Sequence, residues 1–572
     1  MKRLLALVLC LAMLIPMMVA CGGNGTTPED TSGNKPSGGA NNKEPEKVAE
    51  PLLLENLSEY TIIYPDIGMN AELNTEIRAL RDAIKDKFDE SLDLKSDFIS
   101  QKNPIKAREI LISKTNRPES AEVYAKVPRL NDYAIQIVDE KLVVAASTDE
   151  MLVLVLHSLI NRINDLPEDT TAFFTPEMQM LSTDAYDIEA VTVDGNDLGG
   201  YTIVCTNNTS ALGMAYELQA RLIDAYDYKL WVRTEQDVET LDKAIVFGET
   251  KFGLPEGVTG IANDQYYLGI ANGNLYVYAT DAAVLYQAIE KVVSQTADPK
   301  TYQVSINMID VIEKPVLTAL TSMSFNLWVS NVTDERVSHV VERIKRVKPD
   351  TLGVQEASST WVNKLKAALE PEYGYIGVGR DANGTGEHSG IFYKKSTIKL
   401  IEGGTKWMSD TPDVVSKYPE SACNRVFTYA VFERLSDGKR FLHVNAHTDH
   451  TGANGGVRLK QLKVLVKFVL ANYSNLPVLI TGDLNATEST VEIQHVLTSG
   501  WDNAAKIAFK TSNAATFPPN GSIIDFCLTS NDDFMVFEYA VDTYKYSGNK
   551  DYQKEGKDPS DHCPIYIRFE LR

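Results

Sequence analysis

The feature that most constrains the fold is a series of apolar, strand-like segments that end in polar residues, from about Val316 onward. Carboxylates, amides or imidazoles stand at or near seven of these ends, and the residues are Asn326, Glu356, Glu387, His447, Asp483, Asn485, Asp525, Asp561 and His562. A single polar residue at a strand end is usually a turn former. Seven such ends in one domain predict a shared site.

The residue types in this series favour metal-assisted hydrolysis. Hard oxygen ligands suit Mg²⁺, Mn²⁺ or Ca²⁺ better than zinc. Histidines beside several acids can supply the base and the acid for displacement at phosphorus, while a metal neutralises the oxyanions. The pair Asp561 and His562 precedes the final apolar strand, residues 565–571, and places a ligand and a titratable base at one strand end.

In the order of these segments, residues 316–572 resemble the endonuclease/exonuclease/phosphatase superfamily, which includes pancreatic-type deoxyribonucleases, bacterial sphingomyelinases and inositol-polyphosphate phosphatases. The motifs that carry the resemblance are Ser324–Leu327, Gln355–Glu356, Gly379–Asp381, Gly386–Tyr393, Asn445–His450, Gly482–Asn485, Ile524–Phe526 and Ser560–His562. It implies an α/β (α+β) fold: a four-layer α/β sandwich with two mixed sheets face to face and the site where their strand ends meet. An amphipathic helix is expected at residues 334–347.

The resemblance also implies roles for the metal-binding and water-activating residues. Glu356 corresponds to the principal metal ligand, with Asn326 and Asp561 completing or supporting the metal shell. His562 corresponds to the group that activates the attacking water, oriented by Asp525. A carboxylate behind an imidazole fixes its tautomer and favours the imidazolium that forms on proton transfer.

Further roles concern the phosphate. The resemblance implies that Asp483 and Asn485 position the water and the phosphate oxygens, and that His447, paired with Glu387, binds phosphate or protonates the leaving oxygen. Arg380 is a candidate phosphate clamp, with a surface salt bridge as the alternative. The sequence offers two further sets of residues for which packing or a turn is the alternative to a role near the substrate: Trp407 and Arg425, and Asp449 and His450.

The sequence narrows the range of possible substrates only slightly. The segment around Asp525 lacks the Pro-Ala-Trp-x-Asp-Arg pattern of inositol 5-phosphatases. Residues 315–572 hold 29 Lys and Arg against 30 Asp and Glu, so strong nonspecific affinity for DNA is not expected. We predict a phosphodiesterase or nuclease, with a phospholipid (sphingomyelinase-like) or inositol-phosphate hydrolase as the alternative. A surface-binding lipoprotein whose last domain is inactive is the alternative from another class.

The N-terminus has the pattern of a secretion signal. Lys2 and Arg3 precede an apolar run that reaches Cys21, and the ending Val19-Ala20-Cys21 resembles a bacterial lipobox. Residues 1–21 are therefore expected to be a lipoprotein signal peptide that places the chain on the extracytoplasmic face of the cell membrane through a lipid on Cys21. A retained transmembrane anchor is the alternative. Residues 22–50, rich in small and polar residues, are expected to be a disordered linker.

Residues 51–185 and 186–312 form an internal repeat of two small α/β units, each read as strand, helix, strand, strand, strand, helix. Residues 1–314 carry nearly all of the net charge of −22, which argues against a nucleic-acid-binding arm there. The one histidine of the repeats, His157, is expected to be structural. We expect these units to be spacers or to contact carbohydrate or cell-wall polymer.

Four cysteines remain outside the signal segment: Cys205, Cys423, Cys527 and Cys563. They have no CxxC spacing, so the sequence supports neither a zinc site nor a redox motif. An exported protein permits disulfides, but the sequence does not pair these four.

Overall fold

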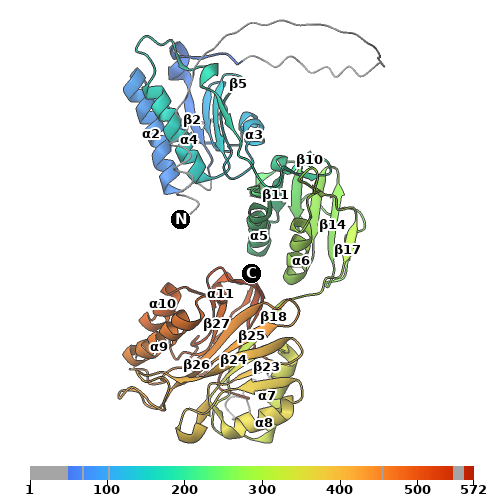
Figure 1. Cartoon of the computed structure of the whole chain (residues 1–572), viewed down its shortest axis with the longest axis vertical. Helices are drawn as coiled ribbons and strands as arrows, with labels where there is room; N and C mark the ends of the chain where they lie inside the picture. Colours follow the sequence, from blue (N-terminus) through green and yellow to red (C-terminus); the bar gives the residue numbers. More distant parts are fainter. Residues whose placement is uncertain (1–48, 67–69, 101–103, 454, 545–558) are drawn as a thin grey trace. The chain divides into compact units, whose positions relative to one another are not determined.

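The structure is a computed structural model that describes residues 49–66, 70–100, 104–453, 455–544 and 559–572. Glu50–Arg572 form one compact unit, along which three α/β regions follow one another (Figure 1). The expected signal peptide, Cys21 and nearly all of the expected linker lie outside the described residues. Within the described part, none of the helices combines the length and the apolar character needed to cross a bilayer.

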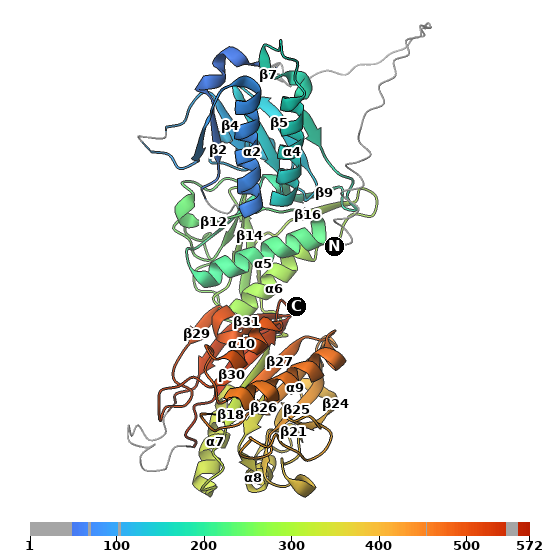
Figure 2. The ribbon, with the colours of Figure 1, turned by 90° about the vertical axis from the view of Figure 1, so that its left-hand side faces the viewer.

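The first region is built on a six-stranded mixed sheet with the strand order β3-β2-β4-β6-β5-β8. The strands are β2 (Thr61–Tyr64), β3 (Asp93–Ser96), β4 (Glu109–Ile112), β5 (Tyr133–Val138), β6 (Lys141–Ala146) and β8 (Met180–Ser182). The first four in spatial order are parallel, and β5 and β8 are antiparallel to their neighbours. Helices α2 (Ala71–Phe88) and α4 (Asp149–Asn164) lie side by side on one face (Figure 2), and α3 (Pro118–Tyr124) contacts β6.

The second region repeats this arrangement with the order β12-β11-β13-β15-β14-β17. Its elements are β11 (Thr202–Cys205), α5 (Thr209–Tyr226), β12 (Trp231–Thr234), β13 (Ala244–Phe247), β14 (Tyr266–Ala271), β15 (Asn274–Tyr278), α6 (Ala282–Val293) and β17 (Val311–Glu313). The sequence interpretation lacked the edge strands of both sheets, β3, β8, β12 and β17, because these strands are short and contain no buried residue. A small separate sheet joins β9 (Ala190–Val193), β10 (Asn196–Asp197) and β16 (Gln303–Ile306).

The third region contains two larger sheets. The seven-stranded sheet has the order β21-β23-β19-β18-β32-β31-β29, and the six-stranded sheet has the order β24-β25-β26-β27-β30-β28. The strands of the first are β18 (Leu320–Asn326), β19 (Thr351–Gln355), β21 (Tyr373–Ile376), β23 (Ile391–Lys394), β29 (Lys510–Ser512), β31 (Phe534–Val541) and β32 (Ile565–Leu571). Those of the second are β24 (Ile398–Trp407), β25 (Val426–Arg434), β26 (Arg440–His447), β27 (Val478–Asp483), β28 (Trp501–Asn503) and β30 (Asp525–Ser530).

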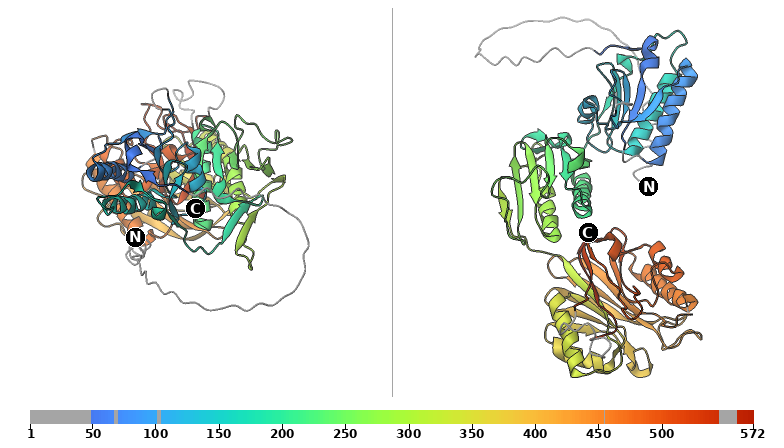
Figure 3. Two further views of the ribbon diagram at one scale, coloured as in Figure 1. Left: turned by 90° about the horizontal axis from the view of Figure 1, so that it is seen from above. Right: turned by 180° about the vertical axis from the view of Figure 1, so that it is seen from behind.

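Three apolar clusters separate four layers and confirm the expected sandwich. One cluster lies between the sheets, where Phe441 of β26 meets Phe569 of β32 edge to face at 6.0 Å. A second packs α7 (Asp334–Val347) and α8 (Ser359–Leu369) on the seven-stranded sheet. The third packs α9 (Gly455–Tyr473) and α10 (Val491–Thr498) on the six-stranded sheet (Figure 3). Each fully buried aromatic or large aliphatic side chain contributes about 1.5–3 kcal/mol to the stability of the folded protein.

Helix α7 shows how local sequence sets these elements. Thr333 caps its N-terminus by accepting a hydrogen bond from the backbone N–H of Arg336, and acidic residues occupy its first turn. Basic residues occupy its last turn, and Lys348 ends it in the left-handed conformation. Val340 and Ile344 are buried against the sheet. The amphipathic helix expected at residues 334–347 is confirmed.

Candidate active site

Strand register brings the polar strand ends together. Asn326 pairs with Gln355 where the parallel strands β18 and β19 end, and Glu356 follows directly. In the six-stranded sheet, Asp483 of β27 pairs with His447 on one side and with Asp525 on the other. Neighbouring residues in register lie about 5 Å apart. The sheets therefore present two rows of carboxylates, amides and imidazoles at one end of the sandwich.

A close approach of the two sheets holds these rows together. Gln355 Nε2 of the seven-stranded sheet lies 2.6 Å from Asn445 Oδ1 of the six-stranded sheet, and Asn445 Nδ2 donates to the Val354 carbonyl at 2.9 Å. Gly353 permits the approach, because a Cβ there would lie 2.5 Å from Asn445 Oδ1 and 2.6 Å from Thr481 Oγ1. The sequence interpretation did not identify this buried network.

His562 and Asp525 form a buried pair. Nδ1 of His562 lies 2.9 Å from Asp525 Oδ2, which directs Nε2 toward Asp483 Oδ2 at 3.7 Å. The Phe517 ring packs against the imidazole at 4.8 Å. Burial opposes a charge on His562, but the surrounding carboxylates, Asp525 foremost, outweigh it and raise its pKa to about 10. The carboxylates thus stabilise the imidazolium. A divalent cation bound to the same acids would offset their charge and lower this pKa toward the range in which the ring can accept a proton.

Carboxylates crowd the space beside this pair. Asn326 Nδ2 lies 3.2 Å from Glu356 Oε1 and 2.9 Å from Asp483 Oδ2, so one amide links two acids from different sheets. Burial and the neighbouring Asp525 raise the pKa of Asp483. Burial raises the pKa of Asp561, and the charge of Glu356 adds to the shift. Carboxylates packed this closely repel one another when they are ionised. A divalent cation bound among them would offset their charge, so the cluster suits such an ion.

The same contacts refine the expected ligand set. Ligand atoms of Glu356, His447 and Asp483 lie close enough together to hold a metal, as do those of Asp483, Asp525 and His562. The amide oxygen of Asn326 already accepts a hydrogen bond from the Trp328 N–H at 3.0 Å. Asn326 therefore orients two acids through its nitrogen, and its oxygen keeps one lone pair for a metal.

Arg425 determines the state of His447. Its Nη1 lies 2.8 Å from His447 Nδ1 and its Nη2 lies 2.9 Å from His450 Nδ1. A guanidinium only donates, so Nδ1 of His447 accepts and the proton of the neutral ring stands on Nε2. Burial, with the positive charge of Arg425 next, holds the pKa of His447 well below its usual range. His447 is therefore a neutral hydrogen-bond donor that faces Asp483 at 3.5 Å.

The expected pairing of His447 with Glu387 is wrong. Glu387 Oε2 instead accepts from Arg380 Nη1 at 2.7 Å, and the Arg380 carbonyl accepts from the Trp407 indole N–H at 2.7 Å. Arg380 and Glu387 are both mostly buried. Burial raises the pKa of Glu387, while Arg380 partly offsets the shift. The sequence interpretation missed this arrangement. Arg380 and Glu387 lie in one loop and form an ion pair with each other, so Glu387 does not pair with His447 of another strand.

Other residues at the edge of the site hold its loops. The Asn485 N–H donates to Asp483 Oδ1 at 2.9 Å, and Asn485 itself has a positive φ of 48°. Asp449 accepts from Ser421 Oγ at 2.9 Å and from the Ala422 N–H at 2.7 Å. Asp449 thus anchors the loop that precedes β25, while His450 contacts Arg425.

Arg336 is a buried residue that the sequence interpretation missed. It donates to the Pro559 carbonyl from Nη2 at 2.7 Å and to the Leu327 carbonyl at 2.8 Å. It thereby joins the loop after β18 to the loop that carries Asp561. The sequence did contain one indication of this role. Arg336 lies in the first turn of α7, where the helix dipole favours acidic residues.

The cysteines and His157 take no part in this site. All four cysteines that the structure describes are free thiols, and Cys205 and Cys527 are buried. His157 is exposed on α4, with Nδ1 3.3 Å from Glu76 Oε1. The interpretation of His157 as a structural residue agrees with this position.

Residues 323–562 match the sequence model of the Endonuclease/Exonuclease/phosphatase family. Among solved structures, an endonuclease/exonuclease/phosphatase from Bacteroides vulgatus is similar at 26% identity, covering 44% of this chain and 99% of that chain with a TM-score of 0.40. A family protein from Bacteroides thetaiotaomicron is similar at 29% identity, covering 44% and 97% with a TM-score of 0.40. A mannosyl-6-phosphatase from the same organism is similar at 28% identity, covering 44% and 99% with a TM-score of 0.39. No curated protein sequence matches the chain significantly.

Proposed function

We propose that residues 323–562, which match the sequence model of the Endonuclease/Exonuclease/phosphatase family, hydrolyse phosphodiesters with a divalent metal and with water activated by His562 and Asp525. The observation that carries the proposal is the 2.9 Å contact between these two side chains beside a cluster of buried acids. Mg²⁺ is the proposed ion, with Mn²⁺ or Ca²⁺ as alternatives.

Each residue then has a defined task. Glu356, Asp561 and Asp483 would hold the cation, which supplies charge neutralisation for the phosphoryl oxygens when bound. His562 accepts a proton from water at Nε2, and Asp525 stabilises the resulting imidazolium. Asn485 helps to position the water or a phosphoryl oxygen. His447 donates a hydrogen bond from Nε2 to a phosphoryl oxygen.

The charges around the site support a diester over a monoester. Arg380 is the proposed phosphate clamp, yet its guanidinium is already paired with Glu387 at 2.7 Å. Arg425 is committed to two imidazoles. The positive charge left for a doubly charged monoester is therefore limited, whereas a diester carries one charge. Nucleic acid is the substrate that we favour, with phospholipid or inositol-phosphate esters as the alternative.

The cellular location of the enzyme is part of the same proposal. The N-terminal pattern that ends at Cys21 supports a lipid-anchored protein on the extracytoplasmic face of the cell membrane. The two repeated units, residues 51–312, are proposed to contact carbohydrate or cell-wall polymer. Export would bring the active site to phosphate esters outside the cell.

A substrate panel tests the hydrolytic proposal. The protein is assayed on bis-p-nitrophenyl phosphate, p-nitrophenyl phosphate, DNA, RNA and sphingomyelin, with Mg²⁺, Mn²⁺, Ca²⁺ or EDTA. We expect faster turnover of the diester than of the monoester, and loss of turnover in EDTA. His562→Ala should abolish turnover, whereas His157→Ala, a matched change at an exposed histidine, should not alter it.

Four outcomes would count against the proposal. Turnover in EDTA, or undiminished turnover in His562→Ala, would refute the mechanism. Faster hydrolysis of the monoester would refute the proposed substrate class and leave the mechanism standing. Failure to hydrolyse any phosphate ester, together with polysaccharide binding by the repeats, would favour the inactive surface-binding lipoprotein.

A further inference from the structure

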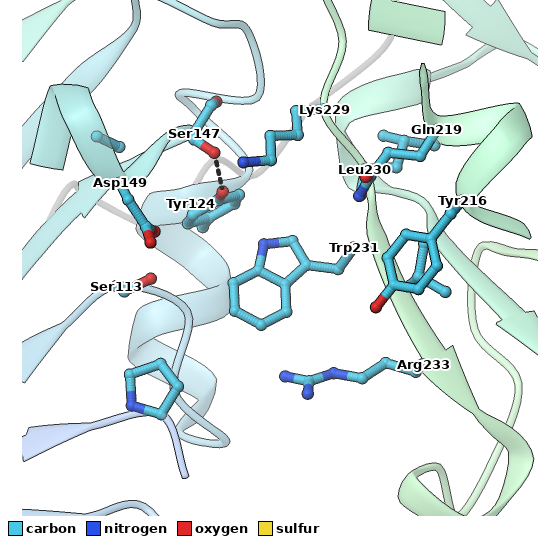
Figure 4. Close-up of a pocket in the computed structure, with 13 residues that line it drawn as sticks. Ser113, Tyr124, Ser147, Asp149, Tyr216, Gln219, Lys229, Leu230, Trp231 and Arg233 are labelled. Carbon is cyan, nitrogen blue, oxygen red and sulfur yellow. Dashed lines mark hydrogen bonds between the residues drawn. The ribbon is translucent and has the colours of Figure 1, made fainter. Parts of the chain in front are cut away.

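A cavity of about 310 Å³ lies where the two repeated units meet, far in sequence from the hydrolytic site. Figure 4 shows Tyr124, Ser147 and Asp149 from the first unit on one side, and Trp231 and Arg233 from the second on the other. The indole of Trp231 projects into the space between them. The Tyr124 hydroxyl donates to the Ser147 carbonyl at 3.2 Å, which fixes that ring in the wall.

The position of the cavity in the first sheet is one where α/β proteins bind ligands. β3 lies beside β2 on one side, and β4 lies beside β2 on the other. Chain order therefore reverses between β2 and β4, and the residues that follow these two strands, Pro65 and Ser113, line the cavity. Ligands of open α/β sheets bind at such a reversal, outside the carboxyl ends of the strands.

The walls combine rings with hydrogen-bonding groups. Trp231 and Tyr124 meet edge to face at 5.8 Å, and the Tyr216 side chain lies 52% exposed at the rim. Ser147 and Gln219 add polar groups. Aromatic rings beside donors and acceptors suit a small ring-shaped ligand that carries hydroxyls.

Positive charge exceeds negative charge in the lining. Lys229 and Arg233 face the cavity with Asp149 as the one acid of the lining, and among described residues neither cation forms an ion pair. Arg233 lies 4.5 Å and Lys114 lies 5.3 Å from the centre of the Trp231 indole ring. Burial and the nearby charge of Arg233 lower the pKa of Lys114 to about 7. Asp237 and Asp97 act on Arg233 from outside this lining, yet burial prevails and lowers its pKa.

We propose that this cavity binds a small sugar that carries an anionic group, either a carboxylate or a phosphate. The sugar ring contacts Tyr216 and the edge of Trp231, and the anionic group is attracted by both Lys229 and Arg233, which lie on opposite sides of the indole. The site gives the proposed carbohydrate contact of residues 51–312 a location and a charge preference. It is separate from the hydrolytic site, so its failure would leave the proposed hydrolysis untouched.

Isothermal titration calorimetry on the full-length protein tests the site. Glucuronate, glucose 6-phosphate and glucose are titrated in EDTA, which suppresses metal-dependent turnover. We expect one of the two anionic sugars to bind at one site, and which of them binds tighter identifies the anionic group. Glucose should bind at least about tenfold more weakly, because it lacks the anionic group that forms a charge-assisted hydrogen bond with these cations.

Variants locate the binding. Lys229→Gln and Arg233→Gln should each weaken binding at least about tenfold, whereas Lys85→Gln, a matched change on the exposed side of α2, should not. Tyr216→Ser alters an exposed rim residue, so it should fold normally and still weaken binding. The proposal is overturned if neither anionic sugar binds at millimolar concentration, if glucose binds as tightly, or if the folded cavity variants keep the wild-type affinity.

Discussion

Oδ2 of Asp525 lies 2.9 Å from Nδ1 of His562, and the charge of Asp525 contributes to the raised pKa of that histidine. Asp525→Asn keeps the shape of the side chain but removes the charge. The imidazolium formed during hydrolysis then loses its stabilisation, so we expect kcat to fall by about 10²–10⁴-fold. Because the pKa of His562 falls, the acidic limb of the kcat/KM profile should move to lower pH. Activity within twofold of wild type would contradict the assigned role.

Lys114 predicts a dependence of stability on pH. Burial and Arg233 lower its pKa from 10.5 to about 7 in the folded protein. Between these values the unfolded chain binds more protons at this residue than the folded chain does, so this residue makes stability rise with pH. Thermal unfolding of Lys114→Gln should therefore show a smaller rise in Tm from pH 7 to pH 10 than wild type. Identical slopes for the two proteins, with Lys85→Gln as a control, would count against a depressed pKa.

At the scale of elements, Gly353 on β19 sets the distance between the two sheets. A Cβ at this position would meet Asn445 Oδ1 at 2.5 Å and Thr481 Oγ1 at 2.6 Å. Gly353→Ala should thus separate β19 from β26 or break the amide network, with a loss of about 1–3 kcal/mol in the free energy of unfolding. Denaturant unfolding measures the loss. Gly452→Ala is a control for space, because nothing lies within 4 Å of a Cβ there and its backbone is not left-handed.

Arg336 joins the loops that follow β18 and precede β32 by donating to the carbonyls of Leu327 and Pro559. Arg336→Met keeps much of the packing and removes these donors. We expect a loss of about 1–3 kcal/mol in stability from unsatisfied carbonyls. Because Asp561 follows Pro559 closely, the metal concentration needed for half-maximal activity should also rise. An unchanged metal requirement in the folded variant would show that Arg336 does not position Asp561.

The strand-end acids and histidines were predictable because they occur directly after apolar runs whose ends meet in a sandwich. The pairings of the charged loop residues were not predictable. Arg380 pairs with Glu387 inside one loop, and Arg425 reaches His447 only because β25 pairs with β26. The polar network around Asn445 was hidden for a related reason. A buried amide in a strand has the same sequence signature as one in a turn.

At the scale of the whole molecule, the second repeat shares an apolar cluster with the C-terminal region. Phe509, Met535 and Phe537 pack in the same cluster as buried residues of α5 and α6. Phe537 meets Tyr286 edge to face at 5.7 Å, and Arg568 Nη1 lies 2.7 Å from Asp281 Oδ2. The expected boundary near residue 315 therefore separates two sequence regions, but residues on both sides of it contribute to one buried apolar cluster.

This shared surface predicts opposite effects of one substitution in two contexts. In the full-length protein, Phe537→Ser removes a buried ring and should cost about 3–5 kcal/mol of stability. In a chain that begins at residue 315, the same ring is exposed and promotes association, so Phe537→Ser should increase the monomer fraction in analytical ultracentrifugation. Turnover per folded molecule should be similar in both chains, because the hydrolytic residues all lie within residues 326–562. A short chain that is already monomeric and as stable as the full-length protein would show that the two regions fold independently.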